Sequence, residues 1–234
     1  MEISPGIEII GKSLWFKKQK ALVIADLHIG YEEALNKQGI LVPRMQFKET
    51  LSELKVLLEQ TKPKLIIING DLKHEFGQIS RQEWNETIAI LDLLMKFSKI
   101  ILIKGNHDTI LSTIARERGL KIFNYFILGG VCFLHGDKIV ETEKIARCKT
   151  LIIGHEHPSI SLSEGMKIEK YKCFLLGKYK DKKLVVMPSL LPIIEGSDIR
   201  RGEFLSPYLK NIQNFEVFAV GNKIYKFGKL KNIK

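Results

Sequence analysis

The chain has 234 residues, of which 45% are hydrophobic, a composition that supports a sizeable core and excludes intrinsic disorder. No apolar stretch approaches the roughly 20 residues of a membrane span, and the amino terminus lacks a secretion-signal pattern, so we expect a cytoplasmic protein with no membrane partner. The net charge of +11 favours polyanionic partners, because it raises their local concentration.

The three cysteines, Cys132, Cys148 and Cys173, are isolated in the sequence and form no CxxC pair. This spacing argues against a disulfide scaffold and against a thiolate zinc site. We therefore predict that all three are buried and act as small apolar residues.

Short apolar runs rich in Ile and Val alternate with helical patterns over the first two thirds of the chain. Their length and composition are typical of buried strands. The predicted strands cover residues 21–25, 64–68, 99–103, 131–135 and 150–154. One helix is predicted over residues 44–61, after Pro43, and a second begins at the capping-box pattern of Ser80 and Glu83. This alternation predicts an α/β protein.

The pattern changes after about residue 160 to strand-like segments separated by turns. Residues 167–187 and 214–228 are each predicted to form a hairpin, the second with a turn at residues 221–222. We expect one continuous domain over residues 1–234, with a β-rich and lysine-rich part from about residue 160 to 234. The lysines of this part are consistent either with a solvated surface or with a patch that faces nucleic acid.

Polar residues follow each of the predicted strands at its carboxyl end. They form the segments "ADLHIG", "NGDLKH", "GNHD", "LHGD" and "IGHEH", and five of the six histidines lie just beyond a strand end. Asp26 and His28 are two residues apart, which in an extended segment points them to the same side. The carboxyl ends of strands in an open α/β sheet form one ligand-binding edge, so these side chains are predicted to converge.

The types of these side chains restrict the ion that they could bind. Carboxylate, imidazole and amide oxygen without thiolate suit manganese, iron or zinc. The donors are too many for one tetrahedral site, whereas two ions about 3.5–4 Å apart that share a carboxylate would use them all. Such a pair clamps both oxygens of an in-line displacement at phosphorus, which predicts phosphoester hydrolysis.

The motifs "DLH", "GD", "GNHD", "HG" and "GHEH", in this order over about residues 20–160, resemble the calcineurin-like metallophosphoesterase superfamily. The resemblance implies a four-layer αββα sandwich, the metallo-dependent phosphatase fold, with two mixed sheets flanked by helices. It also implies that a hydroxide between two divalent ions, most simply Mn²⁺ with Fe, Zn or Ni as alternatives, attacks the phosphorus.

The resemblance implies a role for each residue that matches a motif. Asp26, His28 and His157 would hold one metal, and Asn106, His135 and His155 the other, with Asp71 bridging. His107 would face the phosphate and stabilise charge or protonate the leaving oxygen, and Asp108 would hold the imidazole of His107. Asp108 could also be the N-cap of a helix before Leu111.

His74 belongs to the segment "GDLKHE", which resembles the second motif of SbcD-type nucleases, where this histidine lies near the substrate phosphate. A loop histidine can equally be just exposed. The segments "DLHIGYEEAL" and "MPSLLPIIEGSDI" further resemble small archaeal SbcD-related phosphoesterases and ligase-associated PdeM-like enzymes. About 77 residues follow His157, and they are predicted to be sheet, unlike the DNA-capping region and ATPase-docking helix of full SbcD-type nucleases.

The leading functional prediction is a dinuclear-metal-dependent phosphodiesterase that cleaves DNA or RNA. An alternative is a cyclic-nucleotide, nucleotide or phosphoprotein phosphoesterase, because motifs at the metals do not determine the substrate. A third is a non-catalytic scaffold, although no metal ligand is missing. Nucleic acid is the expected partner, with a helicase, a ligase or a second copy of the chain as further candidates.

Overall fold

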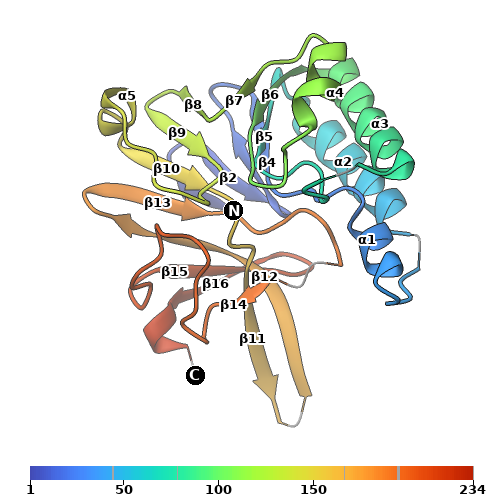
Figure 1. Cartoon of the computed structure of the whole chain (residues 1–234). Coiled ribbons are helices and arrows are strands. Elements are labelled where there is room, and N and C mark those ends of the chain that lie inside the picture. Colours follow the sequence, from blue (N-terminus) through green and yellow to red (C-terminus); the bar gives the residue numbers. More distant parts are fainter. Residues whose placement is uncertain (44, 78, 166, 194–195, 234) are drawn as a thin grey trace.

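The structure, a computed structural model, describes residues 1–43, 45–77, 79–165, 167–193 and 196–233. Two mixed sheets lie face to face, with helices on the outer sides (Figure 1). This confirms the predicted four-layer arrangement. None of the helices in these ranges is both long and apolar enough to cross a bilayer.

The first sheet has the strand order β1-β2-β3-β4-β5-β6-β7. Strands β1 to β4 pair antiparallel, and β4 to β7 pair parallel. The bounds are β1 Glu2–Ser4, β2 Ile7–Ile10, β3 Ser13–Phe16, β4 Ala21–Ile24, β5 Leu65–Asn69, β6 Lys99–Ile103 and β7 Ile122–Phe123. The three predicted strands of this region are confirmed as β4, β5 and β6, whereas β1 to β3 and β7 were not predicted.

The second sheet has the order β14-β11-β12-β13-β10-β9-β8, and β15 pairs with β12 and β16. Its parallel pairs are β9 with β10, β10 with β13 and β11 with β14. The bounds are β8 Tyr125–Leu128, β9 Val131–Leu134, β10 Thr150–Ile153, β11 Pro158–Glu164, β12 Lys167–Tyr179, β13 Lys182–Val186, β14 Ser197–Asp198, β15 Glu216–Val220 and β16 Ile224–Lys229. Both predicted late hairpins are confirmed, as β12–β13 and β15–β16.

Helices α2, α3 and α4 cover the outer face of the first sheet (Figure 1). The bounds are α1 Tyr31–Lys37, α2 Gln46–Thr61, α3 Arg81–Phe97, α4 Leu111–Glu117, α5 Glu143–Ala146 and the 3-10 turn η1 Leu230–Asn232. The outer face of the second sheet is covered differently, by the single turn of α5 and by irregular chain that includes Tyr208, Ile212 and Phe215.

The capping box at the start of α3 is half formed. Ser80 is the N-cap, and its hydroxyl accepts a hydrogen bond from the Glu83 backbone N–H at 3.0 Å. The Glu83 carboxylate does not return to Ser80 but accepts from the backbone N–H groups of His74 and Glu75, at 2.8 and 2.9 Å. The start of α3 therefore holds the loop that carries His74.

Apolar side chains from both sheets fill the space between them. Phe16 and Phe133 meet edge to face at 5.4 Å, and both are almost completely buried. The three cysteines are buried and unpaired, as predicted. The sheets are thus packed rigidly against each other, and the carboxyl ends of β4, β5, β6, β9 and β10 meet along one edge.

Candidate metal centre

The structure brings all seven predicted ligands together at this edge. They form two groups whose donor atoms lie within 4.8 Å of one another: Asp26, His28 and His157, and Asp71, His135 and His155. The Asn106 amide oxygen lies 2.7 Å from Nε2 of His135, which adds it to the second group. The groups come from both sheets, so the site exists only where the sheets are packed together.

Asp71 lies between the two groups. Its Oδ2 is 3.7 Å from Nε2 of His28 and 3.3 Å from Nε2 of His135. Within the groups, Nε2 of His28 lies 3.2 Å from Nε2 of His157, and Nδ1 of His155 lies 3.1 Å from Nε2 of His135. One carboxylate can therefore reach two ions.

The backbone at four of these ligands is left-handed. The φ angles are 49° at Asp26, 44° at His28, 63° at His155 and 47° at His157. The extended geometry predicted for the two-residue spacing is therefore wrong: β4 and β10 have already ended, and the ligands stand in turns. Such φ values cost energy in residues with a Cβ, and they cluster at functional sites where packing enforces them.

Two glycines permit the close approach of the ligands. A Cβ at Gly105 would collide with Oδ1 of Asp71, and a Cβ at Gly70, where φ is 98°, would collide with Nδ1 of His135. The φ of Gly105 is not positive, so a left-handed turn does not explain the glycine at this position. It is needed for space, because the bridging carboxylate packs directly on its Cα.

The buried charges of the site act strongly on one another. Burial alone would raise the pKa of Asp26, but His157 and His135 hold it well below its usual range. Burial disfavours the charged form of His135, yet the carboxylates of Asp26 and Asp71 raise its pKa to about 10. Burial depresses the pKa of His28 well below its usual value. The centre thus presents an anionic field that draws positive charge inward.

This field and these donors fit divalent cations. Oδ1 of Asp26 is buried, with Nδ1 of His135 beside it at 3.4 Å, and neither atom has a hydrogen-bond partner among the described residues. A buried anionic oxygen without a donor is costly in a protein unless a cation satisfies it. Imidazole, carboxylate and amide donors are those that borderline and hard divalent metals accept.

His107 stands beside the bridging carboxylate. Its backbone N–H donates to Oδ1 of Asp71 at 2.8 Å, and its Nε2 lies 4.0 Å from Oδ2 of the same residue. Nδ1 of His107 contacts the carbonyl oxygen of His74. Because a carbonyl accepts, this contact places the proton on Nδ1 and leaves Nε2 directed toward the centre.

The contact predicted between Asp108 and the imidazole of His107 is corrected by the structure. The buried Asp108 carboxylate instead accepts from the backbone N–H groups of Leu72 at 3.1 Å, Lys73 at 3.3 Å and Gly105 at 3.0 Å. The alternative N-cap role is also wrong, because the N-cap of α4 is Ile110, without a side-chain bond. Burial and the nearby Asp71 charge raise the pKa of Asp108 to about 7.

His74 lies next to a ligand rather than on the outer surface. Its Nδ1 is 3.4 Å from Nδ1 of His28, and the rings of His74 and His107 stack at 5.1 Å. Burial and the neighbouring His107 lower the pKa of His74 to about 4. The neutral ring therefore has one nitrogen that can accept a hydrogen bond from an N–H of His28.

Two buried charged residues near the centre were missed from the sequence. Nζ of Lys73, completely buried, donates to the carbonyl oxygen of His107 at 2.6 Å. Oε2 of Glu156 accepts from the backbone N–H groups of Leu205 and Ser206 at 2.8 and 2.9 Å. Lys73 lies in the segment "NGDLKH" and Glu156 in "IGHEH", and a charged residue within such a loop was the one signal that the sequence offered. Their hydrogen-bond partners are far away in the sequence, so these contacts were not predictable.

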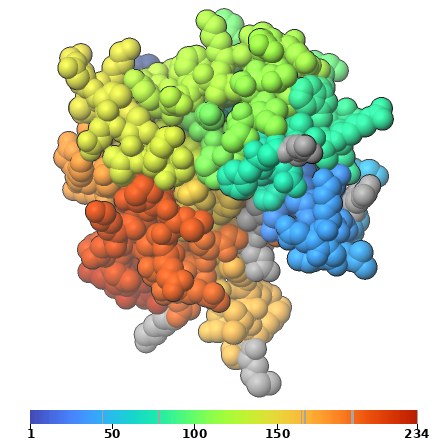
Figure 2. Space-filling model, in the orientation of Figure 1, coloured from blue at the N-terminus to red at the C-terminus, as the bar shows by residue number. Residues whose placement is uncertain are grey.

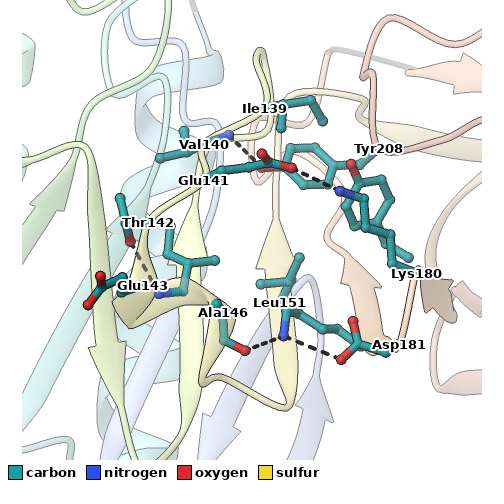
Figure 3. Close-up of a pocket in the computed structure, with 13 residues that line it drawn as sticks. Ile139, Val140, Glu141, Thr142, Glu143, Ala146, Leu151, Lys180, Asp181 and Tyr208 are labelled. Atoms are coloured by element: carbon teal, nitrogen blue, oxygen red, sulfur yellow. Dashed lines mark hydrogen bonds and ion pairs between the residues drawn. The ribbon is translucent and has the colours of Figure 1, made fainter.

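Two separate cavities open at the ligands. One of about 480 Å³ is lined by ligands of both groups together with Tyr31 and Lys170, and one of about 250 Å³ is lined by Asn106 and His135 together with Lys104 and Lys138. A larger cavity of about 570 Å³ lies elsewhere, between α5, Lys180 and Tyr208 (Figure 3). None of the predicted ligands lines it, so it belongs to the outer layer of the second sheet.

Comparison with known proteins places the chain among phosphoesterases. The nuclease MPE of Pseudomonas putida shares 19% identity, with a TM-score of 0.67 over 92% of each chain. YfcE, a phosphoesterase from E. coli, shares 13% identity, with a TM-score of 0.41 over 86% of this chain and 88% of the other. No curated protein matches significantly. The model of the calcineurin-like phosphoesterase family matches residues 20–185. These residues carry every ligand described above, and the chain belongs to the calcineurin-like phosphoesterase family.

Proposed function

We propose that the protein is a metal-dependent phosphodiesterase that cleaves nucleic acid. The observation that carries this proposal is the shape of the site: two separate cavities open at the ligand groups, one lined by Lys170 and the other by Lys104 and Lys138 together with Asp137. A mononucleotide needs a pocket closed around one base and sugar, whereas a polynucleotide has to pass the metals in both directions. The nuclease MPE, whose fold matches, supports the same class of substrate.

The ligand groups would each hold one divalent ion, with Mn²⁺ as the proposed metal. Asp26, His28 and His157 form one site, Asn106, His135 and His155 the other, and Asp71 is shared. When bound, the two ions would supply Lewis acidity toward the phosphate oxygens and lower the pKa of water.

His107 would act on the substrate through Nε2. Because the carbonyl of His74 holds the Nδ1 proton, Nε2 would give a proton to the leaving oxygen only from the doubly protonated ring, and this cation would also stabilise charge on the phosphate. Asp108 serves this step indirectly, because it holds together the backbone of the loops that carry Asp71 and His107. Lys73 restrains the same loop through the carbonyl of His107.

The test is a set of manganese-supported assays on single-stranded DNA, duplex DNA, RNA and bis-p-nitrophenyl phosphate, at low and high salt. We expect cleavage of at least one polynucleotide, with substrate binding that weakens as salt rises. Efficient hydrolysis of a nucleotide or phosphoprotein, with no cleavage of any polynucleotide at low salt, would contradict the proposal and favour a small-substrate phosphoesterase.

A further inference from the structure

We propose that the β11–β12 hairpin is an arm that binds the sugar-phosphate backbone of a polynucleotide as it leaves the metal centre. This inference rests on the proposed function and names the surface that would select a polymer over a small diester. Strand β11 and the first part of β12 extend beyond the rest of the molecule (Figures 1 and 2), whereas the second part of β12, from Cys173 to Tyr179, pairs with β13 and β15 inside the second sheet.

A depression leads from the metal centre to this arm. The cavity of about 480 Å³ at the ligands shares four wall residues with a further cavity of about 290 Å³: Lys170, Gly196, Ser197 and Leu205. The outer cavity extends to Arg201 and Phe204. Lys170 therefore lies where the two cavities meet, and Arg201 lies further out on the same path.

One face of the hairpin is turned toward this path. In the antiparallel register, Ser159 lies opposite Lys172 and Ser161 lies opposite Lys170, so these four share a face. Ser159 is buried and Lys172 is held by the body of the protein at the base of the hairpin, whereas Lys170, further out, is exposed and lines both cavities. Serine hydroxyls and lysine ammonium groups are common donors to phosphate oxygens.

The opposite face of the hairpin is different. It carries Ile160 and Leu162 beside Tyr171, which pack against the apolar cluster of the second sheet. The hairpin is thus two-sided, with its apolar side on the body and its polar side on the path from the metals.

The base of the arm is fixed to the metal centre. Nζ of Lys172 donates to the carbonyl oxygen of Ser189 at 2.8 Å, and the Ser189 hydroxyl donates to the carbonyl oxygen of Asp26 at 2.9 Å. A rigid base holds Lys170 at a constant distance from the ligands, which binding of an ordered strand requires.

Acidic residues limit the width of this path. Asp198 and Glu203 also line the outer cavity, and Oδ1 of Asp198 accepts from the backbone N–H of Arg200 at 3.0 Å. They would repel phosphates and so confine a strand to the side of Lys170 and Arg201. The outer cavity is therefore expected to bind a single sugar-phosphate backbone along one side, rather than to attract any polyanion over its whole surface.

The experiment compares oligonucleotide binding by the full chain and three variants: Lys170→Gln, Arg201→Gln and the double substitution. A labelled single-stranded 20-mer is titrated by fluorescence anisotropy over a series of salt concentrations. We expect the double variant to bind about tenfold more weakly at low salt and its salt slope to fall by about 1.4, since each lost contact to a single strand removes about 0.7. Its ratio of kcat/KM for the 20-mer to that for bis-p-nitrophenyl phosphate should fall by a similar factor.

The control is Lys149→Gln. Lys149 is also exposed and precedes β10, whereas the predicted ligands follow the other end of this strand. This variant should bind and cleave as the unmodified chain does.

The outcomes separate this inference from the proposed function. One outcome is that the chain cleaves the 20-mer but the double variant binds it with unchanged affinity and salt slope. The proposed role of the hairpin would then be wrong, and the proposed function would be kept. The opposite outcome is that the unmodified chain binds but cleaves no polynucleotide, while the double variant loses affinity. The proposed role of the hairpin would then be supported, and the proposed function would be wrong. Equal losses in the Lys149 control would also overturn the arm, because they would show a general charge effect.

Discussion

Nδ1 of His74 lies 3.4 Å from Nδ1 of His28, whose other ring nitrogen belongs to a metal-ligand group. If His28 binds a metal through Nε2, its Nδ1 carries a proton and donates a hydrogen bond to Nδ1 of His74. His74→Ala should then weaken manganese binding by about 10–100-fold, the usual effect of losing a partner behind a ligand histidine. His74→Gln, whose amide oxygen can accept, should retain more of the affinity. Titration with Mn²⁺ measures both, and lost turnover with unchanged affinity would instead place His74 on the substrate.

Gly105 is needed for the space beside the bridging carboxylate. Gly105→Ala should displace Asp71 and weaken manganese binding at least about tenfold, because Asp71 is shared by both groups. Gly77→Ala is the matched control, since its added Cβ meets nothing within 4 Å and its φ is not positive. Metal content after gel filtration distinguishes the two. Full metal content in Gly105→Ala would contradict this, because it would show that Asp71 can make room for the added methyl group and still bind metal.

Proton donation and metal binding are separable at His107 and Asp71. His107→Gln should lower turnover by roughly two to four orders of magnitude with metal content nearly unchanged, since a positioned proton donor contributes this much. Asp71→Asn should lower turnover and metal occupancy together, because it removes a shared charge. The readouts are kcat and elemental analysis on the same preparations. Equal metal loss in both variants would identify His107 as a ligand.

Glu156 lies between His155 and His157, and its carboxylate accepts hydrogen bonds from the backbone at residues 205–206. Glu156→Ala leaves two buried N–H groups without acceptors and should lower the free energy of unfolding by about 2–4 kcal/mol. Glu156→Gln should lose less, since its amide oxygen can still accept. Urea denaturation in EDTA measures the effect without a contribution from metal. An unchanged midpoint in Glu156→Ala would mean that water replaces the carboxylate.

Lys172 predicts a dependence of stability on pH. Burial and the nearby Lys12 lower the pKa of Lys172 to about 7 from 10.5. Between these values the unfolded chain holds a proton that the folded chain has lost, so a rise in pH stabilises the fold. The free energy of unfolding should therefore rise more steeply from about pH 7 to 10.5 than in Lys172→Met. Parallel curves for the two proteins would contradict this.

Sequence alone predicted the strands that end at the ligands and the convergence of the seven ligand residues. This was possible because a polar segment follows each of the predicted strands. The strand ends lie in two sheets, β4 to β6 in the first and β9 and β10 in the second, and it is the packing of the sheets that brings them together. The short strands β1 to β3 were missed, because three or four residues between glycine turns carry too little periodicity. The contacts of Asp108 were also missed, because its partners at Leu72 and Lys73 are backbone groups that leave no trace in residue type.

The outer part of the site was beyond sequence reasoning for another reason. Glu156 and Leu205 are 49 residues apart, and Ser189 and Asp26 are 163 apart. Neither pair shares a motif, and nothing in the spacing connects them. The surroundings that hold and extend the centre are therefore visible only in three dimensions.

The long separation of Ser189 from Asp26 has a consequence for biosynthesis. At usual elongation rates the ribosome needs on the order of ten to thirty seconds to synthesise the intervening residues. During this time Asp26 and His28 are already outside the ribosome as an incomplete set that can hold a metal only weakly. The proposed ligand set is complete only after synthesis of the second sheet, so we expect the metal to come from the ions available to the finished chain rather than to the nascent chain.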